Sequence, residues 1–185
     1  SGCFFEGPCN FNAQFGFAVA GASDVDGDGF PDVIVGAPFS SGSELTLENG
    51  YAALYRGSAG GLIPTAAWLK YGETGGLHTG ADVGPVGDLN GDGRGDIAIA
   101  TPDETSPDGL RGRVTYFLGH SNAPSIAETF RTWGVNAIAK SMCDTGCCVS
   151  KIDFNLDGFT DALTFSTLSH SSRVDRVQLT MGRGL

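Results

Sequence analysis

The sequence is poor in basic residues, and no run of lysine and arginine occurs along it. Eleven Lys and Arg residues stand against twenty-one Asp and Glu residues, which gives a formal net charge of -10. Because proteins bind nucleic acids through cations that neutralise phosphates, this balance argues against DNA or RNA as a partner. The sequence also lacks an apolar run of about eighteen residues, so it predicts no membrane span. No signal-peptide core stands at its start, and we expect a soluble chain already trimmed of any leader.

Cysteine is absent from the long middle of the chain. Two cysteines, Cys3 and Cys9, lie near the start, and the other three, Cys143, Cys147 and Cys148, lie far along the chain. Such clusters are typical of local disulfides and indicate an oxidising compartment, so we expect a secreted or cell-surface protein. The odd count leaves the connectivity open: the fifth thiol is free, bonded to another chain, or without a partner that a longer protein supplied. A zinc site is a poorer interpretation, because no second ligand pair accompanies the second cluster.

Long helical patterns are scarce as well, whereas glycine is abundant. The chain of 185 residues contains 29 glycines, and 41% of its residues are hydrophobic. This composition allows a packed core built from short strands and tight turns. We therefore predict an all-β fold in a single domain or a segment of one.

An acidic motif occurs three times at nearly constant spacing. DVDGDGFPD (24–32, loop 1), DLNGDGRGD (88–96, loop 2) and DFNLDGFTD (153–161, loop 3) begin 64 and then 65 residues apart. Each motif leads into a strand-like run: VIVGAP, IAIATP or ALTFST. A second such run ending in glycine follows in each unit: GYAALYRG, GRVTYFLG or RVQLTMG. A fixed period of this length indicates a repeat architecture, here with three units.

The spacing within each loop predicts a Ca²⁺ site. Side chains at positions 1, 3, 5 and 9 of a tightly turned loop can converge with the carbonyl of position 7, and hard oxygen ligands in that number suit Ca²⁺. Glycine at position 6 permits the sharp turn. An ion would also relieve the repulsion among the crowded carboxylates. The predicted side-chain ligands are Asp24, Asp26, Asp28 and Asp32; Asp88, Asn90, Asp92 and Asp96; and Asp153, Asn155, Asp157 and Asp161, with the carbonyls of Phe30, Arg94 and Phe159.

The residues that follow the loops distinguish them from EF-hands and from ordinary acidic turns. An EF-hand has a bidentate Glu at position 12 and continues into a helix. This chain has Val35, Ile99 and Thr164 there, within runs that are apolar or β-branched. Such runs predict strands buried on both faces, so each loop joins strand to strand. Ordinary acidic turns would account for one loop but not for three copies at equal spacing.

The first unit contains a further pair of motifs around its loop. Phe15-Gly16 precedes loop 1 and Gly36-Ala37-Pro38 follows it, and with the DxDxDGxxD loop they resemble the FG-GAP repeat of integrin α-subunit β-propellers. The second unit departs at Thr79 and Thr101, and the third lacks a clear Phe-Gly. The resemblance implies one four-stranded antiparallel sheet per unit, with calcium in the loop that joins the first two strands.

The three units predict three propeller blades with defined limits. We place blade 1 at residues 13–62, blade 2 at 63–124 and blade 3 at 125–185, and we interpret residues 1–12 as an N-terminal strand or the remnant of a neighbouring blade. Propellers have four to eight blades, and this family is similar to seven-bladed rings. Three blades therefore make an incomplete propeller or one that other chains complete.

Several short motifs invite other interpretations that the context does not favour. Arg94-Gly95-Asp96 spells a tripeptide that integrins bind, but Asp96 belongs to loop 2 and is committed to the metal. Asp144-Thr145-Gly146 lacks the second copy that an aspartic protease needs. We interpret the three histidines as surface residues in turns, and we expect the large aromatic residues to pack between blades or to cap strand ends. No catalytic residue is predicted, so we expect the chain not to be an enzyme.

These observations predict a noncatalytic, extracellular, calcium-binding propeller module for protein or glycan recognition in adhesion. Its contacts would come from the longer segments 39–49 and 103–111. One alternative is a structural subunit of an oligomer or filament that assembles through open blade edges. A second is an accessory propeller of a secreted hydrolase. The ligand remains open, because a fold alone does not define it.

Overall fold

All regular secondary structure in the described part of the chain is β-strand. The computed structural model describes residues 13–41, 48–109, 111–121, 128–133, 137–138, 157–158, 162–167 and 174–180. Side chains are described for residues 13–41, 48–109, 112–121 and 157–158. Among these residues there is no helix long and apolar enough to cross a membrane.

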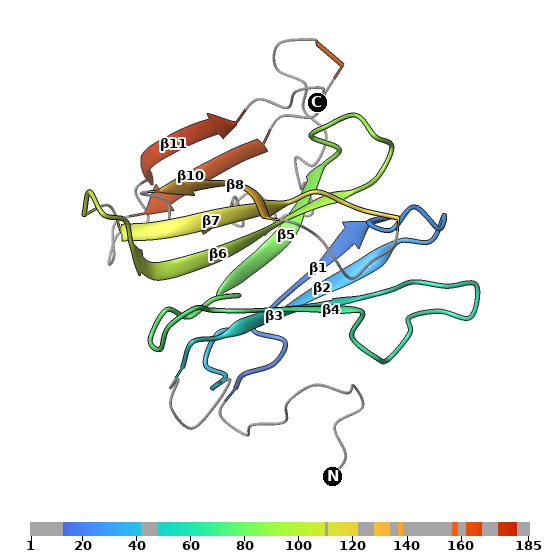
Figure 1. Ribbon diagram of the computed structural model, residues 1–185, viewed down its shortest axis with the longest axis horizontal. Helices are drawn as coiled ribbons and strands as arrows, with labels where there is room; N and C mark the ends of the chain where they lie inside the picture. Colours follow the sequence, from blue (N-terminus) through green and yellow to red (C-terminus); the bar gives the residue numbers. More distant parts are fainter. Residues whose placement is uncertain are drawn as a thin grey trace.

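The strands form three antiparallel sheets that follow one another along the chain (Figure 1). The first sheet contains β1 (Ala18–Ser23), β2 (Asp32–Ala37), β3 (Tyr51–Tyr55) and β4 (Trp68–Tyr71). The second contains β5 (Asp82–Gly87), β6 (Asp96–Thr105), β7 (Arg111–Phe117) and β8 (Glu128–Trp133). The third contains β9 (Ala137–Ile138), β10 (Ala162–Thr167) and β11 (Val174–Thr180). In each sheet, spatial order follows chain order, as in a meander.

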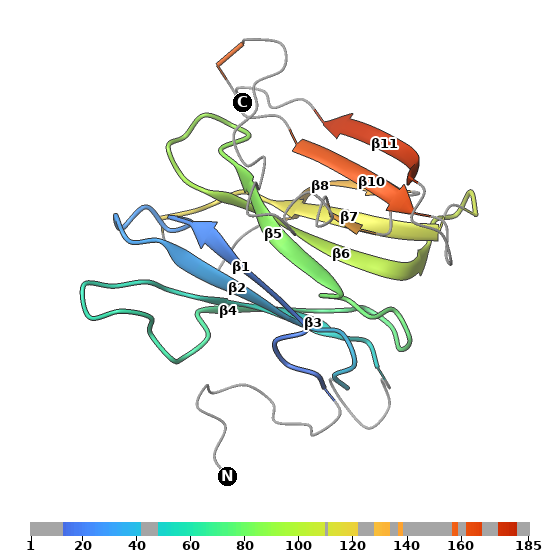
Figure 2. The ribbon, with the colours of Figure 1, turned by 180° about the vertical axis from the view of Figure 1, so that it is seen from behind.

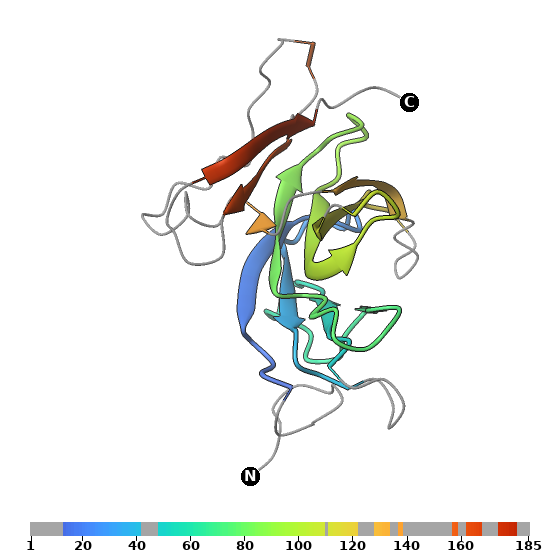
Figure 3. The ribbon, with the colours of Figure 1, turned by 90° about the vertical axis from the view of Figure 1, so that its left-hand side faces the viewer.

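The first strands of successive sheets lie beside each other. β1 packs against β5, and β5 packs against β9. The view from behind in Figure 2 shows β1 alongside β5, and the side view in Figure 3 shows the second sheet between the other two. This is the arrangement of consecutive propeller blades, and the predicted fold class of an unclosed all-β propeller segment is confirmed.

A continuous apolar layer fills the space between the first two sheets. Ile34 and Leu54 of the first sheet meet Ile97 and Phe117 of the second, and all four side chains are buried. Trp68 lies edge-on to Phe117 with ring centroids 5.1 Å apart, as predicted for an aromatic residue between blades. Each such side chain stabilises the fold by about 1.5–3 kcal/mol on burial, so the two sheets are held together as one unit.

The sheets end later than the predicted unit boundaries at residues 62 and 124. β4 begins at Trp68 and pairs with β3, and β8 begins at Glu128 and pairs with β7. The Gly-Gly-Leu of residues 60–62 marks a loop between β3 and β4 and not the end of the sheet. Among the described residues, the third sheet shows three of the four predicted strands. The N-terminal segment 1–12 lies outside the described residues.

Candidate metal centre

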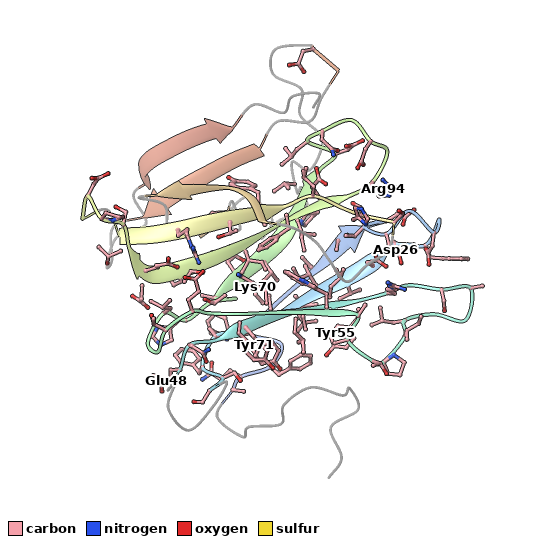
Figure 4. All side chains as sticks on the ribbon, viewed as in Figure 1. Asp26, Glu48, Tyr55, Lys70, Tyr71 and Arg94 are labelled. Carbon is pink, nitrogen blue, oxygen red and sulfur yellow. The ribbon has the colours of Figure 1, made fainter. Side chains whose placement is uncertain are left out.

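Loops 1 and 2 lie where the sequence places them, each between the first two strands of its sheet. Loop 1 joins β1 to β2, and loop 2 joins β5 to β6. The two loops meet at one edge of the molecule, where the labelled Asp26 and Arg94 lie near each other (Figure 4). Of loop 3, only Asp157 and Gly158 are described, and both are exposed. The other predicted ligands of loop 3, Asp153, Asn155, Phe159 and Asp161, lie outside the described residues.

The aspartate at position 1 organises each loop. Asp24 accepts hydrogen bonds from the backbone N–H groups of Gly27, Asp28 and Gly29, at 2.7, 3.0 and 2.8 Å. In loop 2, Asp88 accepts three from the corresponding positions at 2.7, 3.1 and 2.8 Å, donated by Gly91, Asp92 and Gly93. The turn therefore wraps around one carboxylate in both loops.

Glycine is required at positions 4 and 6 of loop 1, where the turn needs a left-handed backbone. Gly27 and Gly29 have φ angles of 78° and 92°. The matching glycines of loop 2 have φ angles of 73° and 87°, and Gly158 of loop 3 has 91°. Only glycine adopts these angles without a steric cost. Asp157 and Gly158 thus place the same turn at position 6 of the third loop.

The carboxylates of Asp24, Asp26 and Asp28 converge. Each offers an oxygen, and these three oxygens lie within 4.8 Å of one another. In loop 2, Asn90 takes the middle position, and its side-chain oxygen accepts from the Asp92 N–H at 3.2 Å, just as Asp26 accepts from Asp28. All of these candidate metal ligands are oxygen atoms, which a hard divalent cation prefers. The residues present therefore fit Ca²⁺.

The aspartate at position 9 braces its loop to the sheet. Asp32 accepts from the N–H of Val25 and of Gly57, both at 2.9 Å, and it is 1% exposed. Asp96 accepts from Leu89 and Gly119 at 2.6 and 2.8 Å and is fully buried. A carboxylate oxygen has two lone pairs, so an oxygen that accepts one N–H can still bind a cation.

Burial raises the pKa of both position-9 aspartates, Asp32 and Asp96. Burial raises the pKa of Asp32, against the opposing effect of its hydrogen bonds to Gly57 and Val25. The pKa of Asp96 is raised to about 6, first by burial and then by the negative charges of Asp88 and Asp92. Both shifts express the cost of keeping a carboxylate charged beside other carboxylates away from water. A bound dication would reverse that cost.

Two arginines flank the aspartates, one beside each loop. Arg56, at the end of β3, lies 3.0 Å from the Asp26 carboxylate, measured from its Nε atom. Arg94 of loop 2 lies 3.3 Å from Asp92 through Nη1. Its amide also donates to Asp92 at 2.9 Å, as the Phe30 amide donates to Asp28 at 2.8 Å in loop 1. The position-7 residues, whose carbonyls are predicted ligands, are thus held in the same turn.

The other predicted motifs have different outcomes. Asp96 and Gly95 are buried, so Arg94-Gly95-Asp96 is not presented to a receptor, as interpreted. His78, predicted as a surface residue, is half-buried: its Nδ1 lies 2.5 Å from Asp103, and its ring centroid is 4.9 Å from that of Phe39. No periodicity or motif marks this histidine, so its position could not be predicted from the sequence. The cysteines and the Asp144 motif lie outside the described residues.

The matches to a known repeat family fall on the first two units of the chain. The FG-GAP repeat model matches residues 15–55 and 79–117. These two stretches contain β1 to β3 and β5 to β7, each with its acidic loop. The matched repeats therefore coincide with the first three strands of the first two sheets.

Integrin α-subunits are similar to this chain. Integrin alpha-4 of Xenopus laevis is 27% identical over 176 residues, which is 91% of this chain and 16% of that protein. Integrin alpha-IIb of Homo sapiens is 40% identical over 119 residues, covering 59% and 11% of the two chains. Integrin alpha-PS2 of Drosophila melanogaster is 35% identical over 116 residues, covering 60% and 8%. The chain thus spans 8–16% of the length of these relatives, and it carries FG-GAP repeats at residues 15–55 and 79–117.

Proposed function

We propose that this chain is a noncatalytic, calcium-binding β-propeller module of an extracellular protein, which recognises a protein or glycan in adhesion. The observation that carries the proposal is the duplicated cation loop. Loops 1 and 2 repeat the same hydrogen bonds from backbone N–H groups to side-chain oxygens at positions 1, 3, 5 and 9. Such agreement between two loops 64 residues apart indicates a common ligand, and the relatives named above support the extracellular setting.

Calcium suits these loops better than magnesium. Ca²⁺ accepts six to eight oxygen ligands in flexible geometry, whereas Mg²⁺ demands a near-ideal octahedron and keeps several waters. Each loop offers four side chains and one carbonyl from a single turn, which is a dedicated protein cage. Loop 3 has the same residue types at positions 1, 3, 5 and 9 as loop 2. We therefore propose three Ca²⁺ ions, with the fifteen ligands predicted from the sequence.

The proposed role of calcium is structural. The cation loops join β1 to β2 and β5 to β6, so they lie at the opposite strand ends from the β2–β3 and β6–β7 connections. Those connections, within 38–50 and 106–110, include most of the segments expected to make contacts. A catalytic metal needs an open position for substrate, whereas these ligands come from one enclosing turn. Calcium would thus make the scaffold rigid while loops at the other end meet the ligand.

Two substitutions test the metal assignment directly. Asp26→Ala and Asp92→Ala each remove one proposed ligand, from loop 1 and loop 2 respectively. We expect each variant to bind one calcium fewer than the parent by elemental analysis after gel filtration. Asp108→Ala is the matched control, because Asp108 is an exposed acid in the turn between β6 and β7. An unchanged calcium content in both loop variants would contradict the assignment.

Recognition itself needs a separate experiment. The purified chain should bind members of an array of glycans and extracellular-matrix proteins in calcium and lose that binding in a chelator. Binding that survives complete removal of calcium would contradict a role for the ions in presenting the recognition loops. Loss of binding together with unfolding in chelator would still agree with a structural role, since the proposal makes the ions part of the scaffold.

A second candidate function is assembly through the open face of the first sheet. Val19 on β1 is 62% exposed, and Phe17 just before it is 51% exposed. Both residues precede or belong to the strand whose other face packs on the second sheet through Ala18 and Ala22. An exposed apolar strand of this kind is expected to be covered by a neighbour. Light scattering after size exclusion, in calcium and in chelator, tests this: an oligomer supports assembly, and a stable monomer contradicts it.

A further inference from the structure

Loop 2 contacts loop 1 through three consecutive positions, two of them directly and the third through Gly119. The N–H of Gly95, at position 8 of loop 2, donates a hydrogen bond of 2.7 Å to the carbonyl of Asp24, at position 1 of loop 1. Asp24 is the aspartate around which loop 1 is wound. A backbone hydrogen bond thus joins position 8 of loop 2 to the first proposed ligand of loop 1.

The residue before Gly95 reaches loop 1 with its side chain. Arg94 lies against Gly27, since a Cβ placed on that glycine would stand 2.9 Å from the Arg94 Nε atom. The same arginine pairs with Asp92 and supplies the proposed position-7 carbonyl of loop 2. Its conformation therefore depends on loop 2, while its side chain lies against Gly27 of loop 1; Figure 4 shows Arg94 near Asp26 of that loop.

Asp96, the residue after Gly95, is connected to loop 1 through Gly119. Asp96 holds the amide of Gly119, and a Cβ on Gly119 would lie 2.6 Å from the carbonyl oxygen of Val25 in loop 1. Val25 is fully buried in the apolar layer between the sheets. Positions 7, 8 and 9 of loop 2 are thus in contact, directly or through Gly119, with positions 4, 1 and 2 of loop 1.

From these contacts we propose that Arg94 and Gly95 are positioning residues for the cation site of loop 1, so that an ion in loop 2 raises the affinity of loop 1. The inference rests on the proposed calcium function. An ion in loop 2 fixes Asp92, Arg94 and Asp96 in one arrangement, and that arrangement holds the Asp24 carbonyl and the Gly27 backbone in place. Loop 1 then loses less conformational freedom when it binds. Electrostatics alone predicts the reverse sign, because two bound dications repel each other.

Position 8 also limits how far this coupling extends. In loop 1 the residue that corresponds to Gly95 is Pro31, which has no N–H to donate. Loop 1 therefore cannot make the same hydrogen bond to a loop on its other side. In this contact loop 2 donates the hydrogen bond and loop 1 accepts it.

The glycine amides at position 6 allow each site to be followed separately. Gly29 donates to Asp24 and Gly93 donates to Asp88, both at 2.8 Å, so each amide resonance reports an ion in its own loop. Calcium is titrated into the ¹⁵N-labelled, chelator-stripped 185-residue chain and into its Asp92→Asn variant. We expect the Gly29 midpoint to move to about fivefold higher calcium in the variant. Because coupling is reciprocal, Asp28→Asn should move the Gly93 midpoint by a similar factor.

A double substitution tests whether the contact residues transmit the effect. In an Arg94→Ala background, we expect Asp92→Asn to move the Gly29 midpoint by about twofold or less, down from about fivefold. Phe30→Ala is the matched control, because Phe30 holds the same position 7 in loop 1 and its Cβ packs toward Gly57 of its own sheet. In that background the full shift should persist.

The outcomes separate this inference from the proposed function. If Gly29 and Gly93 both respond to calcium but Asp92→Asn leaves the Gly29 midpoint unchanged or lowers it, the coupling is wrong and calcium binding stands. If the full shift persists in the Arg94→Ala background, Arg94 is not a positioning residue. If neither amide responds to calcium in the parent chain, the proposed function fails as well.

Discussion

Gly36 on β2 lies against the backbone of Gly80, just before β5 of the neighbouring sheet, so closely that a Cβ on Gly36 would overlap the Gly80 carbonyl oxygen. These are the glycines of two signature motifs: Gly36 opens Gly-Ala-Pro in the first unit, and Gly80 closes Thr-Gly in the second. The Gly16 amide donates to Gly36 at 3.1 Å, and the Gly80 amide donates to Ala100 at 3.0 Å. Each of these two hydrogen bonds lies within one unit, whereas the contact between Gly36 and Gly80 joins the first unit to the second.

Gly36→Ala should therefore push the first two sheets apart. We expect a loss of about 2–3 kcal/mol in the free energy of unfolding, because the clash is with backbone that cannot move aside. Urea denaturation measures this loss. Gly21→Ala on β1 is the control, since a Cβ there would meet nothing within 4 Å, and it should change the stability by about 0.5 kcal/mol or less. Equal effects of the two substitutions would contradict the close packing.

The same glycines show how much of the fold the sequence could predict. The acidic loops predicted β2, β6 and β10, which begin at or directly after the last loop residue, and the second run ending in glycine in each unit predicted β3, β7 and β11. No such marker precedes the last strands, β4 and β8. The predicted unit boundaries therefore fall before these strands and not after them. Ala100 replaces glycine at the position of Gly36, and the next unit lacks a clear Phe-Gly. At Gly36 the need for glycine comes from the backbone of Gly80 in the next unit, a contact between units that no local pattern marks.

Asp32→Ala should destabilise the protein even in chelator. Its carboxylate accepts two backbone N–H groups from Val25 and Gly57, and their loss leaves two buried donors without this partner. Each such donor costs about 1–3 kcal/mol, so we expect a loss of about 2–5 kcal/mol. Asp28→Ala removes a single bond to the exposed Phe30 amide and should lower stability mainly when calcium is present. Urea denaturation with and without chelator measures the stability loss of each variant. If chelator changes the two losses equally, Asp32 does not have a structural role separate from that of the proposed ligand Asp28.

Chelation should lower the melting temperature of the intact chain. A site filled at a calcium concentration 100 times its dissociation constant stabilises the folded state by about 2.7 kcal/mol. For a chain of this size that corresponds to roughly 5–11 °C per site. Calorimetry in millimolar calcium and then in excess chelator checks the shift. Magnesium added to the chelated protein should restore little of it, and a melting temperature indifferent to calcium would exclude a structural ion.

Calcium binding should release protons near pH 6. The pKa of Asp96 is about 6 in the ion-free protein, so this group is about half protonated there and must lose its proton when a dication binds. Titration calorimetry in buffers of different ionisation enthalpy should show about half a proton released from this group at pH 6 and almost none at pH 8. Asp96→Asn should abolish that release.

The sign of the effect on stability follows from the same shift. The folded pKa of Asp96 is raised above its unfolded value, so its contribution to the stability of the ion-free protein is present at low pH and is lost as the pH rises through about 6. Proton release that is the same at pH 6 and pH 8 would contradict a raised pKa at this residue.

The candidate site was more predictable than its surroundings. The positions of the aspartates and glycines in the loops follow from local spacing, because one turn contains nearly all the interacting groups. The contacts of Gly95 with Asp24 and of Gly119 with Val25 join different sheets, and no local pattern marks them. The same holds for His78 and Asp103, which meet across 25 residues.

Native mass spectrometry of the 185-residue chain in calcium tests the metal assignment most directly, because it counts the ions on each molecule. We predict three calcium ions per chain, two after Asp26→Ala or Asp92→Ala, and none after treatment with chelator. A chain that retains its ion-free mass in millimolar calcium would contradict the proposed metal sites and, with them, the structural role of calcium in this propeller.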